Sequence, residues 1–315
     1  MNPTDFLFPV AALPLAALGA MHLKVKGSSV LVHFGSHRMG FQNPRATRIA
    51  AELAGVATLN IGVAAYMAEH ERHHGLATFA RAGQDPDATL FKTLGLLVPS
   101  GTELALWLRF TWMLVSPVVH CQLSKTRLAG VFVFGPAWRI ALAWSFWGAL
   151  AASFAAAGLL LPWVLGFVLP LLLFGNIGSL LELASEHRFN VECATKGRER
   201  QALLSHARLL GSPPPEGSPF RQPLAWASWT ASMAVAMAVR IGAWPGDLSH
   251  HDAHHIGVRP ALKLTRFGWM NAAYEFSASL WDPSAGRLRR VGSLREAIGE
   301  WFKALVRERG VPPSA

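Results

Sequence analysis

Histidines in this sequence fall into groups whose spacing could place several imidazoles around one point. Residues three or four apart lie on one face of a helix, so each close group can aim two or three imidazoles in one direction. Imidazole binds iron, zinc, copper and nickel, so the ligand type indicates a metal site without naming the metal. Of the 13 histidines, those in groups are His33 and His37; His70, His73 and His74; His251, His254 and His255; and His187, which follows Glu186.

The number of grouped histidines favours two metal ions. Nine of them exceed the four ligands of one tetrahedral zinc site, and two centres would receive about four or five each, with positions left for O2 or water. One alternative is a membrane zinc hydrolase, because the second group also contains the pattern H-E-x-x-H, with His70 and His74 as ligands and Glu71 as the base. That interpretation leaves the first and third groups without a role.

The composition predicts that these groups are carried by membrane helices. The chain is 51% hydrophobic and 15% charged, whereas soluble domains carry about 25% charged residues. No charged side chain occurs between Arg139 and Glu182, and one span needs about 20 residues. We therefore expect residues 140–181 to form a hairpin of two spans that turns near Leu160–Pro162. A further span is expected at residues 6–22, where Asp5 replaces the basic start of a signal peptide.

Basic residues between the expected spans predict the orientation of the chain. Lys24, Lys26, Arg38, Arg45 and Arg48 follow the first span and place its end in the cytoplasm by the positive-inside rule. Both ends of the hairpin then return to that side. We interpret the net charge of +10 as orientation signals and contacts to anionic membrane lipids rather than nucleic acid binding. The two cysteines, Cys121 and Cys193, are too few for a disulfide framework and are expected to be free thiols.

Other apolar stretches leave the number of spans open. Residues 49–67, 104–119 and 224–239 each fit a half-buried helix in the interface as well as a full span. Residues 293–309 predict an amphipathic surface helix, with Ser293 and Glu296 as a capping box. Neither repeats nor a clear domain boundary are found, so we expect one domain over residues 1–315. The predicted fold is an all-α membrane bundle with a helical cap on the cytoplasmic face that holds a histidine-rich site for two metals.

These motifs resemble the membrane fatty acid desaturase superfamily, which also includes acyl and alkane hydroxylases. The family boxes H-x(3–4)-H, H-x(2–3)-H-H and [HQ]-x(2–3)-H-H match the three groups in order, and Asp85-Pro86-Asp87 and Glu186-His187 are also similar to family features. Two departures concern the first and third boxes. Only one span is expected before His33, where the family usually has two, and His250 competes with His251 for the first ligand position of the third box.

The resemblance implies two iron ions bound by the nine grouped histidines, with O2 as co-substrate. The implied reaction attacks an unactivated C–H bond of a fatty acyl or similar lipid chain, by desaturation or, as the alternative, by hydroxylation. The sequence has no flavin or nicotinamide fingerprint, so electrons are expected from a separate protein such as ferredoxin or rubredoxin. The expected location is the cytoplasmic (inner) membrane, with the active site on the cytoplasmic face. Carboxylates expected to orient the ligand imidazoles are Glu71, Glu182, Glu186 and Asp252, and the histidines expected only to pack or to lie at the surface are His22, His120 and His206.

Overall fold

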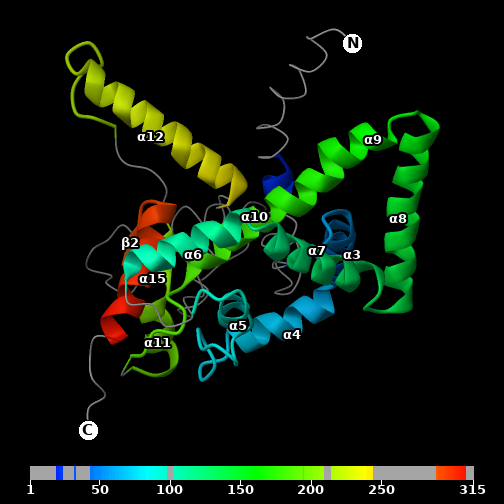
Figure 1. Cartoon of the computed structure of the whole chain (residues 1–315), viewed down its shortest axis with the longest axis horizontal. Coiled ribbons are helices and arrows are strands. Elements are labelled where there is room, and N and C mark those ends of the chain that lie inside the picture. The colour runs from blue at the N-terminus through cyan, green and yellow to red at the C-terminus, as the bar shows by residue number, and fades with distance from the viewer. Residues whose placement is uncertain are drawn as a thin grey trace. The chain divides into compact units, whose positions relative to one another are not determined.

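The computed structural model describes residues 19–23, 32, 43–97, 102–193, 195–208, 214–243 and 289–309. These residues are almost entirely helical (Figure 1), which confirms the predicted all-α class. The strands in these ranges are the three-residue β1 (His206–Arg208) and β2 (Arg289–Val291), which pair in parallel. The helices are α3 (Pro44–Ala57), α4 (Val63–His73), α5 (Pro86–Thr93), α6 (Glu103–Val115), α7 (Pro117–Phe132), α8 (Ala137–Ala156), α9 (Leu160–Trp163), the π-helical turn η2 (Val164–Val168), α10 (Leu169–Glu186), α11 (Gly197–Leu204), α12 (Pro223–Gly242) and α15 (Leu294–Arg309).

The chain divides into two compact units, each with its own core. The first unit combines Met1–His70, Leu114–Leu180 and Ile241–Pro245, and the second combines Glu71–Met113, Leu181–Arg240 and Gly246–Ala315. In the first unit, side chains from α3, α7, α8 and α10, among them Val56, Val131 and Trp147, form one buried apolar cluster. The expectation of one domain over the whole chain stays a prediction.

Among the described residues, three helices are long and apolar enough to cross a membrane, namely Ala137–Ala156, the continuous run Leu160–Glu186 and Pro223–Gly242. The first two correspond to the expected pair at 140–181. Between them the chain turns at Gly158, whose φ of 70° lies in the left-handed region that glycine adopts without a steric penalty. Pro162 lies within the first turn of α9, where a missing N–H is tolerated. The chain is therefore a membrane protein. The expected span at 6–22 lies almost wholly outside the described residues.

The stretch 49–67 does not form one helix, so the alternative of a full span there is wrong. Helix α3 ends at Ala57 and α4 begins at Val63. Neither helix reaches the roughly 30 Å thickness of the hydrocarbon core at 1.5 Å per residue. Buried side chains secure the break, because the Arg139 guanidinium donates from Nη2 to the Asn60 carbonyl (2.6 Å) and from Nε to Glu52 Oε2 (2.9 Å). Glu52 Oε1 in turn accepts from the backbone N–H of Val63 (3.1 Å) at the start of α4.

The stretch 104–119 is also broken. Helices α6 and α7 meet at Ser116 with a bend of 58°, and together they could form one broken span. Proline at position 117 lacks the N–H that would continue the helix, and it keeps the preceding residue out of the α conformation. Ser116 accordingly has extended backbone angles. The imidazole of His120 donates from Nε2 to the Leu114 carbonyl near the break, at 2.7 Å.

Helix α15 supplies much of the core of the second unit. Trp301 and Phe302 are fully buried, and the Trp301 indole donates to the Phe189 carbonyl at 2.8 Å. Its apolar side packs inside the unit, whereas Arg295 and Lys303 on the other side are exposed. At its start, Ser293 Oγ accepts from the N–H of Glu296 (3.2 Å), and the Glu296 carboxylate accepts from Gly292 N (2.6 Å) rather than from Ser293 N.

Candidate metal centre

Three possible metal ligands meet where two helices end. His73 is the last residue of α4, Glu186 is the last residue of α10, and His187 follows it directly. All three side chains are buried in the second unit. The Nε2 atoms of the two imidazoles lie 3.2 Å apart, and Glu186 Oε1 lies 3.0 Å from His187 Nε2 and 3.7 Å from His73 Nε2. One nitrogen from each ring and one carboxylate oxygen therefore point at a common space.

The tautomer of His73 is set by two aspartates. Its Nδ1 lies 3.1 and 3.0 Å from the two oxygens of Asp85 and 3.2 Å from Asp87 Oδ2. Ionised carboxylates only accept, so Nδ1 carries the hydrogen and Nε2 of the neutral ring carries a lone pair. Asp85 is fixed because it also caps α5, accepting from Asp87 N (2.8 Å), and accepts from Ala80 N (2.7 Å). The sequence signal for it was an aspartate before a proline that begins a helix.

The tautomer of His187 is set by a serine that sequence reasoning missed. Ser205 Oγ donates its single hydrogen to the Gln201 carbonyl (2.7 Å). It can therefore only accept from His187 Nδ1, which lies 3.2 Å away. In the neutral ring, Nε2 of His187 then carries a lone pair and faces another acceptor, Glu186 Oε1, at 3.0 Å. Gln201 holds the other side of the site, since its amide donates to the His74 carbonyl at 2.9 Å. Neither residue belongs to a motif that the sequence displays.

Two lone pairs that face each other at 3.2 Å repel unless a proton or a metal cation lies between them. The nearby Glu186 carboxylate adds negative charge at the same place. Two imidazoles and one carboxylate form a donor set that suits iron and also zinc. The residues present fit the iron that the resemblance implies, with Glu186, expected only to orient an imidazole, offering an oxygen as a possible ligand. A second cluster, His73 with Asp85 and Asp87, is explained without a metal, because Asp85 already binds backbone N–H groups and the His73 ring.

The charges around the two imidazoles favour a cation there. Burial lowers the pKa of His73, but the carboxylates of Asp87 and Asp85 outweigh it and hold this pKa well above its ordinary value. Burial also lowers the pKa of His187, and Glu186 offsets this only in part. For the Asp85 carboxyl, burial raises the pKa, and the hydrogen bond from His73 more than reverses that effect. His187 is therefore a neutral imidazole that could bind a metal, and the carboxylates around it carry negative charge.

Aromatic rings enclose the site on its apolar side. The Phe79 ring lies 4.7 Å from the His187 ring and 5.5 Å from that of His73, measured between centroids. Phe189 contacts the His187 ring at 5.7 Å and packs on Trp301 at 5.4 Å. The C-terminal helix α15 thereby supports the chain segment that carries His187. Such an apolar surrounding limits the access of water and strengthens the electrostatic interactions inside.

The other expected site residues have different positions. His70 is half-buried and stacks on Tyr66 (5.4 Å), and His74 meets the His73 ring edge-on at 5.4 Å. Glu71 is exposed, whereas Glu182 is buried one turn before Glu186. His206, expected only to pack or to lie at the surface, is fully buried and donates from Nδ1 to the Ser185 carbonyl (3.1 Å). The expected site residues outside the described ranges are His33, His37, His250, His251, Asp252, His254 and His255.

Comparison with known proteins identifies a family. Residues 7–217 match the sequence model of the family described as fatty acid desaturase. No curated protein and no solved structure matches the chain. The matched region covers more than half of the 315 residues. It includes the first two histidine groups and the Glu186-His187 pair, while the third group lies beyond it. The chain belongs to the fatty acid desaturase family.

Proposed function

We propose that this protein is an O2-dependent di-iron desaturase of fatty acyl or similar lipid chains. The family supports an oxidoreductase that acts on lipid chains, and the proposal adds the metal, the oxidant and the outcome. The observation that carries it is the 3.2 Å approach of His73 Nε2 and His187 Nε2 beside the Glu186 carboxylate. The nine grouped histidines of the sequence provide enough ligands for two iron ions.

The proposed reaction removes two hydrogens from adjacent carbons of the chain. A –CH2–CH2– unit, O2, two electrons and two protons give –CH=CH– and two molecules of water. The electrons come from an external donor such as ferredoxin or rubredoxin. When bound, the iron ions supply the activation of O2 and the removal of hydrogen from the C–H bond. Hydroxylation by the same site consumes the same reductant and inserts one oxygen atom instead.

The residues of this chain have positioning roles in this proposal. Asp85 and Asp87 hold the Nδ1 hydrogen of His73, and Ser205 accepts that of His187, so both Nε2 atoms stay directed at the metal. Such outer partners fix ring orientation and raise ligand basicity. Phe79 and Phe189 keep the ligand rings out of contact with water. We further propose that the site lies at the cytoplasmic face of the cytoplasmic membrane, within reach of an acyl chain and a soluble electron donor.

The zinc hydrolase interpretation has weaker support. It requires the Glu71 carboxylate to act as a base next to a metal held by His70 and His74, yet Glu71 is exposed to solvent. It also leaves His73 without a role, although His73 is the member of this group that converges with His187 and Glu186.

The test is anaerobic purification of the full chain with metal quantification, followed by addition of O2, reduced ferredoxin and membrane lipid. We expect about two iron atoms per chain and a lipid product lighter by two hydrogens. The His187→Ala variant should lose both iron and product, whereas His22→Gln, at a histidine that bonds to the Ile241 carbonyl within the first unit, should retain them. A product heavier by one oxygen would show that the reaction is hydroxylation rather than desaturation. One zinc per chain without iron would overturn the proposal.

A further inference from the structure

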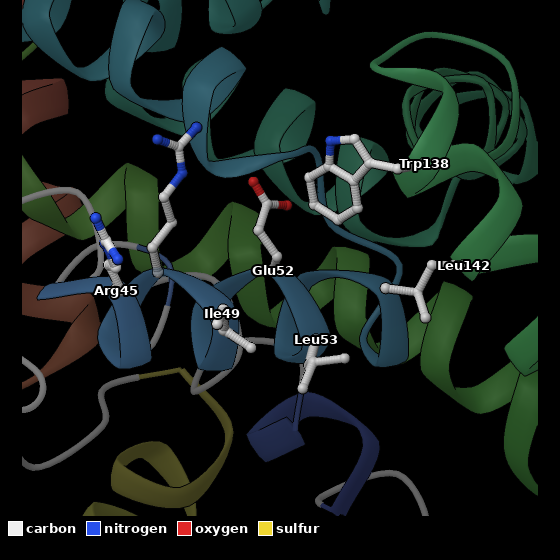
Figure 2. A pocket seen from close by; sticks show the side chains of 7 residues that line it. Arg45, Ile49, Glu52, Leu53, Trp138 and Leu142 are labelled. Atoms are coloured by element: carbon white, nitrogen blue, oxygen red, sulfur yellow. The ribbon is translucent and has the colours of Figure 1, made fainter. Parts of the chain in front are cut away.

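A pocket of about 360 Å³ opens between α3 and α8 in the first unit. Its apolar part is formed by Ile49 and Leu53 of α3 and by Trp138 and Leu142 of α8, and Arg45 and Arg48 of α3 complete it. Figure 2 shows Arg45 at the end of the pocket away from Trp138 and Leu142. A volume of about 300–1,000 Å³ is usual for sites that bind small molecules.

The lining of the pocket is almost wholly apolar, and the exposed residues Arg45 and Arg48 bring positive charge to its edge. Arg45 and Arg48 lie in the first two turns of α3, whose first turn has no acidic residue. A helix N-terminus is itself positive, so arginines there are unfavourable for the isolated helix. Glu52 also lines the pocket, but its carboxylate is used by Arg139 (2.9 Å) and by the N–H of Val63 (3.1 Å). Within the described part of the chain, neither Arg45 nor Arg48 forms an ion pair.

The remaining wall is apolar and exposed. Ile49 is 61% exposed, Leu53 50% and Trp138 54%, and side chains of this kind grouped around a pocket indicate a binding surface. Two guanidinium groups beside an apolar channel match a ligand with an anionic head and a hydrocarbon tail. Arginine binds phosphate oxygens in a bidentate manner, and tryptophan favours the level of lipid headgroups in a membrane.

We propose that this pocket binds an anionic phospholipid, with the phosphate at Arg45 and Arg48 and one acyl chain along Ile49, Leu53 and Leu142. The membrane-spanning helices of the same chain place phospholipid around the protein. The proposal is independent of the catalytic one, because all lining residues of the pocket belong to the first unit and the three converging ligands belong to the second. The lipid would stabilise the packing of α3 against α8.

The test measures retained lipid by native mass spectrometry of the full chain in neutral detergent. Phosphatidylglycerol and phosphatidylcholine with identical acyl chains are added at equal concentration. The wild type should retain one phosphatidylglycerol in preference to phosphatidylcholine. Each basic residue contributes a modest attraction to anionic lipid, so the double variant Arg45→Gln/Arg48→Gln should bind it roughly 10- to 30-fold more weakly. The matched control Lys92→Gln/Lys125→Gln, which removes two exposed charges elsewhere, should bind as the wild type does.

A second arm separates a lipid from a soluble phosphate. Leu53→Gln should weaken phosphatidylglycerol binding roughly 10-fold, because one buried contact of the acyl chain is lost, and millimolar inorganic phosphate should not displace the lipid. Displacement by inorganic phosphate would overturn the proposal in favour of a soluble anion. Equal retention of both lipids, or equal loss in the lysine control, would also overturn it. Unchanged melting of the variants in lipid-free detergent checks that the fold is kept, since they replace exposed side chains.

Discussion

The two facing imidazoles are tuned by different partners. His73 lies against two carboxylates, which favour positive charge on or near its ring, while His187 lies against a hydroxyl group and aromatic rings. The first ring is therefore a strong electron donor to a cation, and the second stays neutral in its buried position. With both rings neutral and their Nδ1 atoms protonated, the two Nε2 atoms face the Glu186 carboxylate as acceptors. Their convergence on Glu186 gives three groups that could hold one metal ion, rather than two separate hydrogen-bonded histidines.

At the residue scale, we predict that Asp85→Asn lowers iron affinity roughly 10- to 100-fold, the usual effect of losing a carboxylate that orients a ligand histidine. Asparagine caps a helix as well as aspartate does, so α5 should still form. The measurement is a competition titration with an iron chelator, accompanied by the melting temperature of the apoprotein. Asp87→Asn serves as the comparison, because it reaches His73 with a single oxygen at 3.2 Å, and its effect should be smaller. Equal affinity of wild type and Asp85→Asn would contradict the assigned role.

Sequence reasoning named the three residues that converge here, His73, His187 and Glu186, but not Ser205, which contacts His187. The spacing of His70, His73 and His74, and the position of His187 after a long apolar run, are local patterns that a helix translates directly into geometry. Ser205 contacts His187 because the chain reverses after α10 and returns through α11. No local sequence pattern near either residue predicts this reversal. The first and third histidine groups stay predictions.

At the element scale, the pair of Arg139 and Glu52 controls how α3, α4 and α8 meet. In the sequence, Arg139 marks the edge of an uncharged run. The structure buries it, because three carbonyl and carboxylate acceptors, on Glu52, Asn60 and Gly130, surround its guanidinium. The apolar sequence of residues 49–67 does not predict the break between α3 and α4, because the break depends on Arg139, about 80 residues further along the chain.

We therefore predict that Arg139→Met destabilises the protein by about 3–5 kcal/mol, the cost of leaving the Glu52 carboxylate buried without its partner. The double variant Arg139→Met/Glu52→Gln should recover part of that loss, since no charge is then stranded. The measurement is thermal unfolding in detergent, read from near-ultraviolet circular dichroism. Arg127→Met is the control, because Arg127 is half-buried and donates to Asn60 Oδ1 over the longer distance of 3.4 Å. An equal loss of stability in Arg139→Met and Arg127→Met would contradict the stabilising role of the buried Arg139–Glu52 pair.

At the scale of the whole molecule, the distribution of charge predicts sidedness. The turn between α8 and α9 has no charged side chain, whereas α7, before α8, carries Lys125 and Arg127, and Arg188 and Lys196 follow α10. Retention of lysine and arginine on the cytoplasmic side then places both outer ends of this pair of spans in the cytoplasm. Because His187 directly follows the second span, the metal centre would lie on the same side, where a soluble electron donor can reach it.

The corresponding prediction uses two reporters in the same chain. A short epitope inserted at Gly158 should be accessible to antibody or protease from outside intact spheroplasts, and an identical epitope inserted between Lys196 and Gly197 should become accessible only after the membrane is opened. The physical reason is that moving the basic side chains near α10 across the membrane is unfavourable, whereas the uncharged turn crosses readily. Replacing Lys125, Arg127, Arg188 and Lys196 with glutamine should produce a mixture of orientations. If the epitope at 196–197 were accessible from outside in the unmodified chain, the cytoplasmic placement of the metal centre would have to be abandoned.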